Sequence, residues 1–131
     1  MTNDEIHSFI ENAIKENRVM LFMKGVPHQP ACGFSARAAG ALNALGVQYA
    51  ALDILPDPRI REELTAVSGW PTIPQLFVDG ELVGGSDIVM EMFESGELAE
   101  LLGAEPPEEP FEAEPQPEPV QRPIGLENRL D

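Results

Sequence analysis

The sequence contains a single cysteine, Cys32, among its 131 residues. One cysteine cannot form a disulfide within the chain, so the fold has to be held together by packing alone. The N-terminal residues MTNDEIHSF lack the basic and apolar character of an export leader. No uninterrupted apolar run approaches the roughly 18 to 20 residues that a membrane span requires. These absences predict a cytoplasmic protein that does not associate with membranes.

Basic residues are also scarce. Eight lysines and arginines stand against 23 acidic residues, which gives a formal net charge of -15. Because nucleic acids and anionic membrane surfaces are bound through clustered Lys and Arg, this balance argues against both as partners. The length suits one compact domain.

The acidic charge and the prolines are concentrated at the C-terminal end. Residues 104–131 contain eight acidic residues, two basic residues and seven of the 13 prolines. Pro and Glu at that density cannot bury enough apolar surface to offset the entropy of ordering the chain. We therefore predict a folded domain in residues 1–103, followed by a disordered acidic Pro/Glu-rich tail in residues 104–131.

The first half of the domain alternates helical and strand patterns. Apolar residues at helical spacing predict a first helix capped by Asn3. The continuous apolar run 19–23 predicts a central strand buried on both faces. A second helix is expected over 34–45, with Phe34 on its buried face, and a second strand over 47–53. Strand, helix and strand then form a right-handed parallel unit.

The second half predicts a helix, a hairpin and a last helix. Asp57 followed by proline indicates a helix start. Two apolar runs around Asp79-Gly80 indicate an antiparallel hairpin, because these residues tolerate the positive φ angles of a tight turn. Ser86 is expected to cap the last helix. The resulting α/β fold has a mixed four-stranded sheet flanked by helices.

Cys32 lies where the loop after the central strand meets the next helix. Unpaired amide groups at a helix start favour a thiolate there, and Lys24 adds a nearby cation. The alternative is an inert, buried cysteine. Ser35 stands where a redox protein of the C-x-x-C type has its second cysteine, so any second sulfur must come from outside the chain.

Three stretches give this pattern a family context. The motifs CGFS at 32–35, WPTIPQLFVDGELVGGSDIV at 70–89 and LFMKG at 21–25 resemble, in register, those of the monothiol glutaredoxins, which have the thioredoxin fold. The resemblance runs from about residue 4 to residue 102. The tail after residue 103 departs from the family pattern, so the resemblance implies nothing about its structure or role.

The resemblance implies that glutathione binds beside Cys32. It implies a cis peptide bond before Pro74, which would expose the backbone of Ile73 for pairing with an extended tripeptide. It also implies partners for the ligand's charged groups. Lys24 and Arg61 suit one carboxylate.

The start of the last helix suits the other end of the ligand. Free amide groups at Ser86 and Asp87 would bind the second carboxylate, and the Asp87 side chain would meet the amine. Thr72 has a supporting role. The alternatives without a binding role are that Lys24 is only a solvated strand end and that Arg61 pairs with an acidic neighbour on its helix. Trp70 and Thr72 would then be loop packing residues, and His28 a surface residue rather than a metal ligand.

Two functions follow from a single thiol with bound glutathione. A 2Fe-2S cluster needs four thiolate ligands, and two chains with two glutathiones supply four. Cys32 is then a metal ligand, and the resemblance implies a cluster-bridged homodimer that passes clusters to apo iron-sulfur proteins, with a BolA-like protein as a further partner. The alternative is a glutathione-dependent oxidoreductase in which Cys32 attacks protein-glutathione mixed disulfides. A third possibility is a binding module whose working part is the tail.

Overall fold

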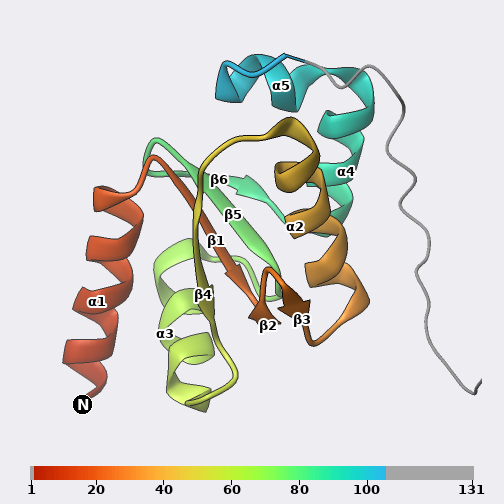
Figure 1. The fold of residues 1–131 in the computed structure, drawn as a ribbon. Helices are drawn as coiled ribbons and strands as arrows, with labels where there is room; N and C mark the ends of the chain where they lie inside the picture. Colours follow the sequence, from red (N-terminus) through yellow and green to blue (C-terminus); the bar gives the residue numbers. More distant parts are fainter. Residues whose placement is uncertain (1, 106–131) are drawn as a thin grey trace, which may run out of the picture.

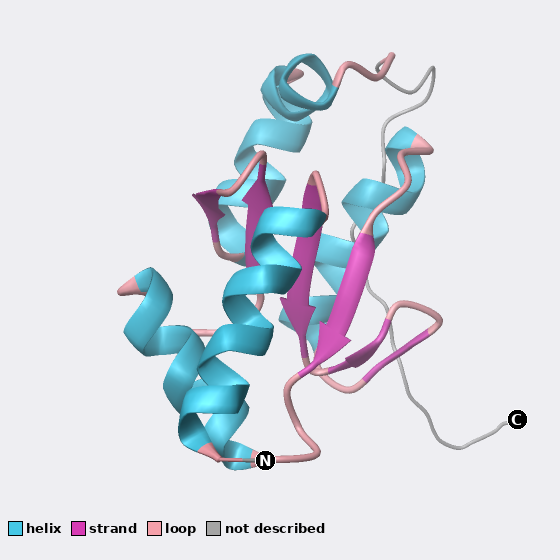
Figure 2. Ribbon diagram, turned by 90° about the vertical axis from the view of Figure 1, so that its left-hand side faces the viewer, coloured by secondary structure: helices cyan, strands magenta, loops and turns pink. Residues whose placement is uncertain are grey.

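The computed structural model describes residues 2–105. Helices lie on both faces of a central sheet (Figures 1 and 2). The elements in chain order are α1 (Asn3–Glu16), β1 (Val19–Met23), β2 (Gly25–Val26), β3 (Gln29–Pro30), α2 (Gly33–Leu45), β4 (Ala50–Asp53), α3 (Pro58–Ser68), β5 (Gln75–Val78), β6 (Glu81–Gly84), α4 (Ser86–Ser95) and α5 (Glu97–Leu102).

The sheet has the strand order β4-β1-β5-β6. Strand β1 runs parallel to β4 and antiparallel to β5, and β5 runs antiparallel to β6. All five residues of β1 are buried, because strands flank it on both sides and helices cover both faces. The predicted α/β fold with a mixed four-stranded sheet is confirmed.

Two apolar clusters fill the space between the sheet and its helices. Alternate residues of β1 point to opposite faces, so Leu21 and Met23 join the cluster with α2, α4 and α5. Met20 and Phe22 join the cluster with α1 and α3, where the ring of Phe22 meets that of Phe77 edge-on at 5.7 Å. Because side chains alternate between the two faces of the sheet, β1 alone contributes residues to both clusters.

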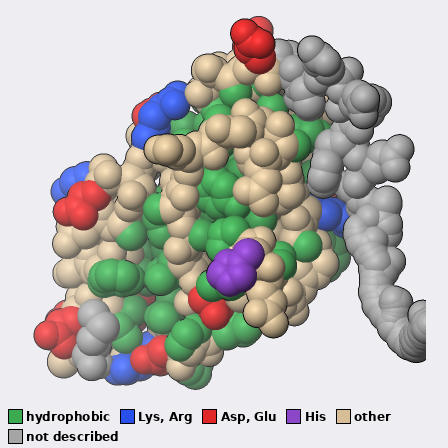
Figure 3. Space-filling model, in the orientation of Figure 1, with side chains coloured by type: hydrophobic (Ala, Val, Ile, Leu, Met, Phe, Trp, Pro, Cys, Tyr) green, Lys and Arg blue, Asp and Glu red, His purple; other side chains and the backbone are tan. Residues whose placement is uncertain are grey.

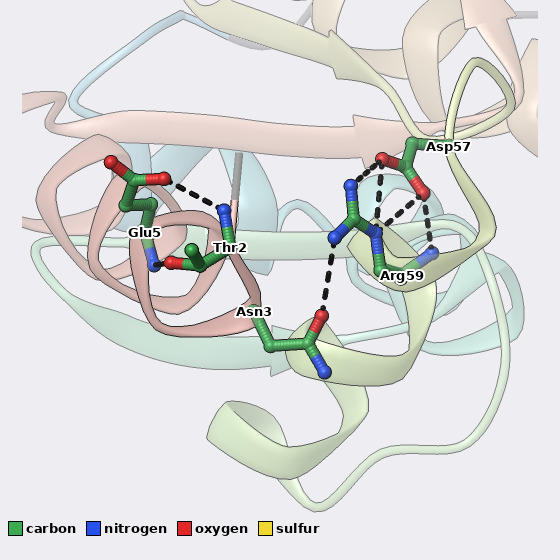
Figure 4. Close-up of polar contacts among 5 residues, drawn as sticks. All are labelled: Thr2, Asn3, Glu5, Asp57 and Arg59. Carbon is green, nitrogen blue, oxygen red and sulfur yellow. Dashed lines mark hydrogen bonds and ion pairs between the residues drawn. The ribbon is translucent and has the colours of Figure 1, made fainter.

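The N-cap of the first helix lies one residue earlier than we predicted. Thr2, not Asn3, is the N-cap: its side chain accepts a hydrogen bond from Glu5 N at 3.1 Å, and Glu5 Oε1 accepts one from Thr2 N at 2.7 Å (Figure 4). The reciprocal pair satisfies two helix-end amides. Asn3 instead accepts a hydrogen bond from Arg59, which is paired with Asp57 at the start of α3. The two helix starts are thus tied together.

Strand β4 is shorter than the predicted strand over 47–53. Its register pairs Ala50 with Met20 and Asp53 with Met23. In that register residues 47 and 48 lie opposite residues 17 and 18, before β1 begins at Val19, so no strand pairs with them. Tyr49 contributes in another way, since its hydroxyl donates to Asn43 Oδ1 of α2 at 2.9 Å.

The hairpin at Asp79-Gly80 is confirmed, and both residues have positive φ angles of 53° and 83°. The last predicted helix is two helices, because Gly96 adopts a left-handed conformation between α4 and α5. Arg18 donates to the carbonyls of Leu101 and Leu102 and so attaches α5 to the start of β1.

The predicted tail lies outside the described residues from 106 onward. Within the described part, the helices are too short or too polar to cross a membrane. On the face seen in Figure 3, apolar side chains occupy much of the middle, and most charged side chains lie toward the margins.

Candidate active site

Cys32 is the N-cap residue of α2, as the sequence predicted. Its backbone is extended, with φ -153° and ψ 153°, and its sulfur accepts a hydrogen bond from Ser35 N at 3.4 Å. The sulfur therefore occupies the place where a capping oxygen usually accepts from the first turn. The side chain is partly exposed, so an external sulfur can reach it.

Ser35 places a hydroxyl beside this sulfur. Ser35 is fully buried, and its Oγ accepts a hydrogen bond from Lys24 N at 3.0 Å. In the thiol form Cys32 Sγ donates to the same oxygen at 3.5 Å. Once the thiol has lost its proton, the Ser35 hydroxyl can donate to the sulfur instead, because a hydroxyl is both a donor and an acceptor. A hydrogen bond thus stands where a second sulfur would stand in a two-cysteine site.

These contacts favour the thiolate form of Cys32. Partial burial raises the pKa of the thiol, but several opposing interactions outweigh it: hydrogen bonds from the Ser35 hydroxyl and from the amides of Ser35 and Phe34, and the positive charge of Lys24. The net pKa of Cys32 is lowered from its ordinary value. An inert buried cysteine does not fit this environment.

A short hairpin that the sequence reasoning missed carries the chain from Lys24 to Cys32. It consists of β2 and β3, with His28 exposed at its turn. Gly25 adopts a φ of 86°, and a Cβ there would lie 2.6 Å from Ala31 N. Asp53 Oδ1 accepts hydrogen bonds from Gly25 N and Leu55 N, at 3.0 and 2.9 Å. The active-site loop is therefore anchored to the end of β4.

A cavity of about 370 Å³ lies beside this loop, within the size range of small-molecule sites. Its lining includes six of the eight predicted site residues: Lys24, Arg61, Thr72, Ile73, Ser86 and Asp87. Cys32 and Pro74 are not part of the lining. Lys24 connects the thiol to the cavity, because it lines the cavity and its charge acts on Cys32.

The floor of the cavity follows the loop before β5. The Ile73–Pro74 peptide bond is cis, as the resemblance implied. Among the described residues, no hydrogen bond reaches the backbone of Ile73. An unpaired extended backbone at a cavity wall is the arrangement to which a peptide can add.

The start of α4 forms the opposite wall. The N-cap is Gly85, not Ser86 as predicted, and it makes no side-chain cap. Ser86 is instead the first helical residue, 8% exposed, and its hydroxyl has no hydrogen-bond partner among the described residues. The first amides of a helix lack internal partners and favour an anion. Asp87 is exposed in the same turn.

Arg61 and Phe34 complete the rim. Arg61 Nη2 donates to the carbonyl of Pro71 at 3.3 Å, so its guanidinium lies over the loop and not along its own helix. Phe34 was expected in the core. It is 56% exposed, lines the cavity and carries the Arg37 guanidinium 5.6 Å from its ring centre. The apolar spacing failed here because Phe34 faces the cavity, and the buried residue of this turn is its polar neighbour Ser35.

Trp70 also lines the cavity, a role that the sequence reasoning left open beside loop packing. Its Nε1 is buried without a hydrogen-bond partner among the described residues. A Cβ added at Gly85 would lie 3.2 Å from that nitrogen. The indole therefore packs directly against the backbone at the start of α4, and a methyl group at Gly85 would require it to shift by a few tenths of an ångström.

Comparison with known proteins gives consistent results. Residues 19–83 match the family model named Glutaredoxin. The chain is 50% identical over 104 residues to the probable monothiol glutaredoxin 2 of Rickettsia conorii, covering 79% of this chain and 97% of that one. It is 56% identical over 93 residues to glutaredoxin 4 of Escherichia coli K12, covering 71% and 81%.

A solved structure is similar as well. A monomeric truncated mutant of Trypanosoma brucei 1-C-Grx1 superposes with a TM-score of 0.69 at 44% identity, over 76% of this chain and 93% of that one.

Proposed function

Because this chain belongs to the monothiol glutaredoxins, we propose that it binds glutathione in the cavity beside Cys32 and carries glutathione-ligated 2Fe-2S clusters. The observation that supports this proposal is a lone thiol with a lowered pKa beside a cavity whose lining includes two cationic side chains, Lys24 and Arg61.

The lining of the cavity suits a tripeptide with two carboxylates and one amine. Lys24 and Arg61 would bind one carboxylate, and the first amides of α4 with the Ser86 hydroxyl would bind the other. The Asp87 carboxylate would meet the amine. The free backbone of Ile73 would pair with the ligand's own peptide groups, in a cavity whose wall Thr72 extends.

Charge supports the same placement. Residues 1–103 contain fifteen acidic and six basic residues, so most of the domain repels an anion. Two of those six basic residues line this one cavity. The local sign of charge is thus reversed where the anionic ligand is proposed to bind.

The cluster follows from counting ligands. Within residues 2–105, no group of three or more His, Cys, Asp or Glu side chains is placed to hold a metal ion. Each chain contributes one thiolate, and a 2Fe-2S cluster needs four. Two protomers with two bound glutathiones supply them. Since half of the ligands are held without a covalent bond to the protein, the cluster is exchangeable cargo.

This proposal includes partners and a location. The homodimer forms through the bridging cluster, and apo iron-sulfur proteins in the cytoplasm receive the cargo. A BolA-like protein can replace one protomer. Val26 and Phe34, which lie on either side of Cys32 in the sequence, are exposed apolar side chains available for contact with such partners.

The lowered thiol pKa favours a second activity, the removal of glutathione from proteins. The Cys32 thiolate attacks the glutathione sulfur of a mixed disulfide, and the protein thiolate leaves. A second glutathione thiolate then attacks the Cys32-glutathione disulfide. This releases oxidised glutathione and restores the Cys32 thiolate.

Visible absorption of protein purified without oxygen tests the main proposal. Wild-type protein prepared with glutathione is expected to be coloured and dimeric, and Cys32→Ser to be colourless and monomeric. Ser95→Ala, which changes an exposed serine at the end of α4, serves as the control and should keep its colour. A colourless wild-type monomer that rapidly reduces mixed disulfides would favour the oxidoreductase.

A further inference from the structure

A buried amide side chain lies beneath the candidate glutathione site. Gln75 is the first residue of β5, directly after the cis peptide bond, and it is fully buried. A buried polar side chain is costly unless it is hydrogen-bonded, so its contacts indicate what it does.

The amide nitrogen of Gln75 makes two hydrogen bonds to the wall of the cavity. It donates to the carbonyl of Trp70 at 2.8 Å and to that of Thr72 at 3.0 Å. Trp70 and Thr72 both line the cavity. The two N–H donors of one side chain are therefore both used on this loop.

The third carbonyl of the loop is held from the other side. Arg61 Nη2 donates to Pro71 O at 3.3 Å. Three successive carbonyls, from Trp70 to Thr72, are thus occupied by side chains, whereas the backbone of the next residue, Ile73, has no such contact among the described residues. The loop presents one unpaired residue to the cavity.

We propose that Gln75 is a positioning residue for ligand binding: its amide holds the loop at Trp70 and Thr72 so that the backbone of Ile73 faces the ligand. Gln75 does not touch the ligand, because it is buried and does not line the cavity. This inference rests on the proposed glutathione site. It adds a buried residue, outside the cavity lining, that affects how tightly the site binds glutathione.

Replacement of Gln75 by Glu gives a signature that simple destabilisation does not. A protonated Glu side chain can still donate one hydrogen bond to a loop carbonyl, whereas the ionised form turns two acceptor oxygens toward two carbonyl oxygens. Burial and these oxygens both favour the protonated form. The loop should therefore be held at low pH and released as the pH rises.

Titration calorimetry with reduced glutathione, on the full chain between pH 5.5 and 8.5, tests the proposal. The quantity compared is the ratio of the variant Kd to the wild-type Kd at each pH, which cancels titration of the ligand and of Cys32. For Gln75→Glu we expect the ratio to rise with pH, reaching about tenfold. For Gln75→Met, which fills the space without donors, we expect a ratio of similar size that does not change with pH.

A matched control separates loop position from stability. Val78 is buried at the other end of β5 and pairs with Val19. Val78→Ala should lower the melting temperature and leave the Kd unchanged. The thiol pKa of Cys32 should stay at its wild-type value in all three variants.

The outcomes distinguish the inference from the proposed function. If the wild type does not bind glutathione, the proposed site and the inference both fall. If both Gln75 variants bind glutathione as tightly as the wild type does, the proposed site stands and the positioning role is wrong. The same conclusion follows if Val78→Ala weakens binding as much as Gln75→Met does and the Kd ratio of Gln75→Glu does not change with pH.

Discussion

The hydroxyl oxygen of Ser35 lies 3.5 Å from the sulfur of Cys32. The same oxygen accepts a hydrogen bond from the backbone of Lys24, at the end of the central strand. The strand end, the buried hydroxyl and the sulfur therefore form one chain of contacts. The residue that replaces a second cysteine is part of what stabilises the first as an anion.

Replacing Ser35 by Ala should raise the pKa of the Cys32 thiol, because it removes the side-chain hydrogen bond that most lowers it. The pH dependence of alkylation by iodoacetamide measures this pKa. We expect the midpoint to move to higher pH and the rate at neutral pH to fall. The unpaired Lys24 amide should also reduce the free energy of unfolding by about 1 kcal/mol. An unchanged alkylation profile would show that the hydroxyl does not act on the sulfur.

Lys24→Met should raise the thiol pKa less than Ser35→Ala does, since the charge of Lys24 is the weakest of the favourable contributions. The difference between wild type and variant should shrink in about 1 M salt, where charges are screened within roughly 3 Å. The same alkylation assay measures both effects. Lys15→Met, on the exposed face of α1, is the charge-matched control and should leave the profile as it is. A larger shift for Lys24→Met than for Ser35→Ala would reverse this ranking.

Gly85→Ala should weaken glutathione binding by pushing the two cavity walls apart. A Cβ at this position would lie 3.2 Å from Trp70 Nε1, close enough that the indole would have to shift, and would also touch the carbonyl oxygen of Pro74 at 3.4 Å. We expect a lower melting temperature and a Kd raised about tenfold. For comparison, a Cβ at Gly33 meets nothing within 4 Å, so Gly33→Ala should not lower the melting temperature. Equal stability of Gly85→Ala and wild type would contradict the close packing.

His7 should make the contact between α1 and α3 depend on pH. Its Nδ1 lies 3.0 Å from Glu63 Oε1 and its Nε2 lies 3.3 Å from Glu11, and the bond to Glu63 raises the pKa of His7 above 6.5. A raised pKa in the folded state gives stability that is complete below about pH 6.5 and is lost as the pH rises through the folded-state pKa. His7→Gln should therefore lose more stability at pH 5.5 than at pH 8.5.

Urea unfolding of both proteins at the two pH values measures this difference. Because the comparison is between wild type and variant at each pH, titration of the other acidic groups cancels. An equal loss at both pH values would mean that the charge of His7 contributes nothing.

Much of the fold could be predicted from local pattern. The buried run of β1, the Asp79-Gly80 turn and the proline after Asp57 are each set by backbone chemistry within a few residues. Two N-caps, predicted at Asn3 and Ser86, were each placed one residue late. The other predictions that failed depended on neighbours distant in sequence. The start of β1 leaves residues 47 and 48 without a neighbouring strand, and Phe34 is exposed because it borders a cavity whose other walls come from later segments of the chain.

The candidate site divides in the same way. Cys32 could be placed at a helix start from sequence because the motif and the cap are local. Asp53 and Gln75 could not, since one supports a loop 28 residues earlier in the chain and the other contacts loop carbonyls through a buried side chain. A polar residue at the start of an otherwise apolar strand, as Gln75 is in QLFV, was the available signal.

Reconstitution with iron and sulfide without oxygen, with and without glutathione, tests the central claim most directly. One thiolate per chain predicts that visible absorption, about two iron atoms per dimer and a dimer in sizing appear only when glutathione is present. Full iron loading without glutathione, or loading of Cys32→Ser to the same level, would contradict it.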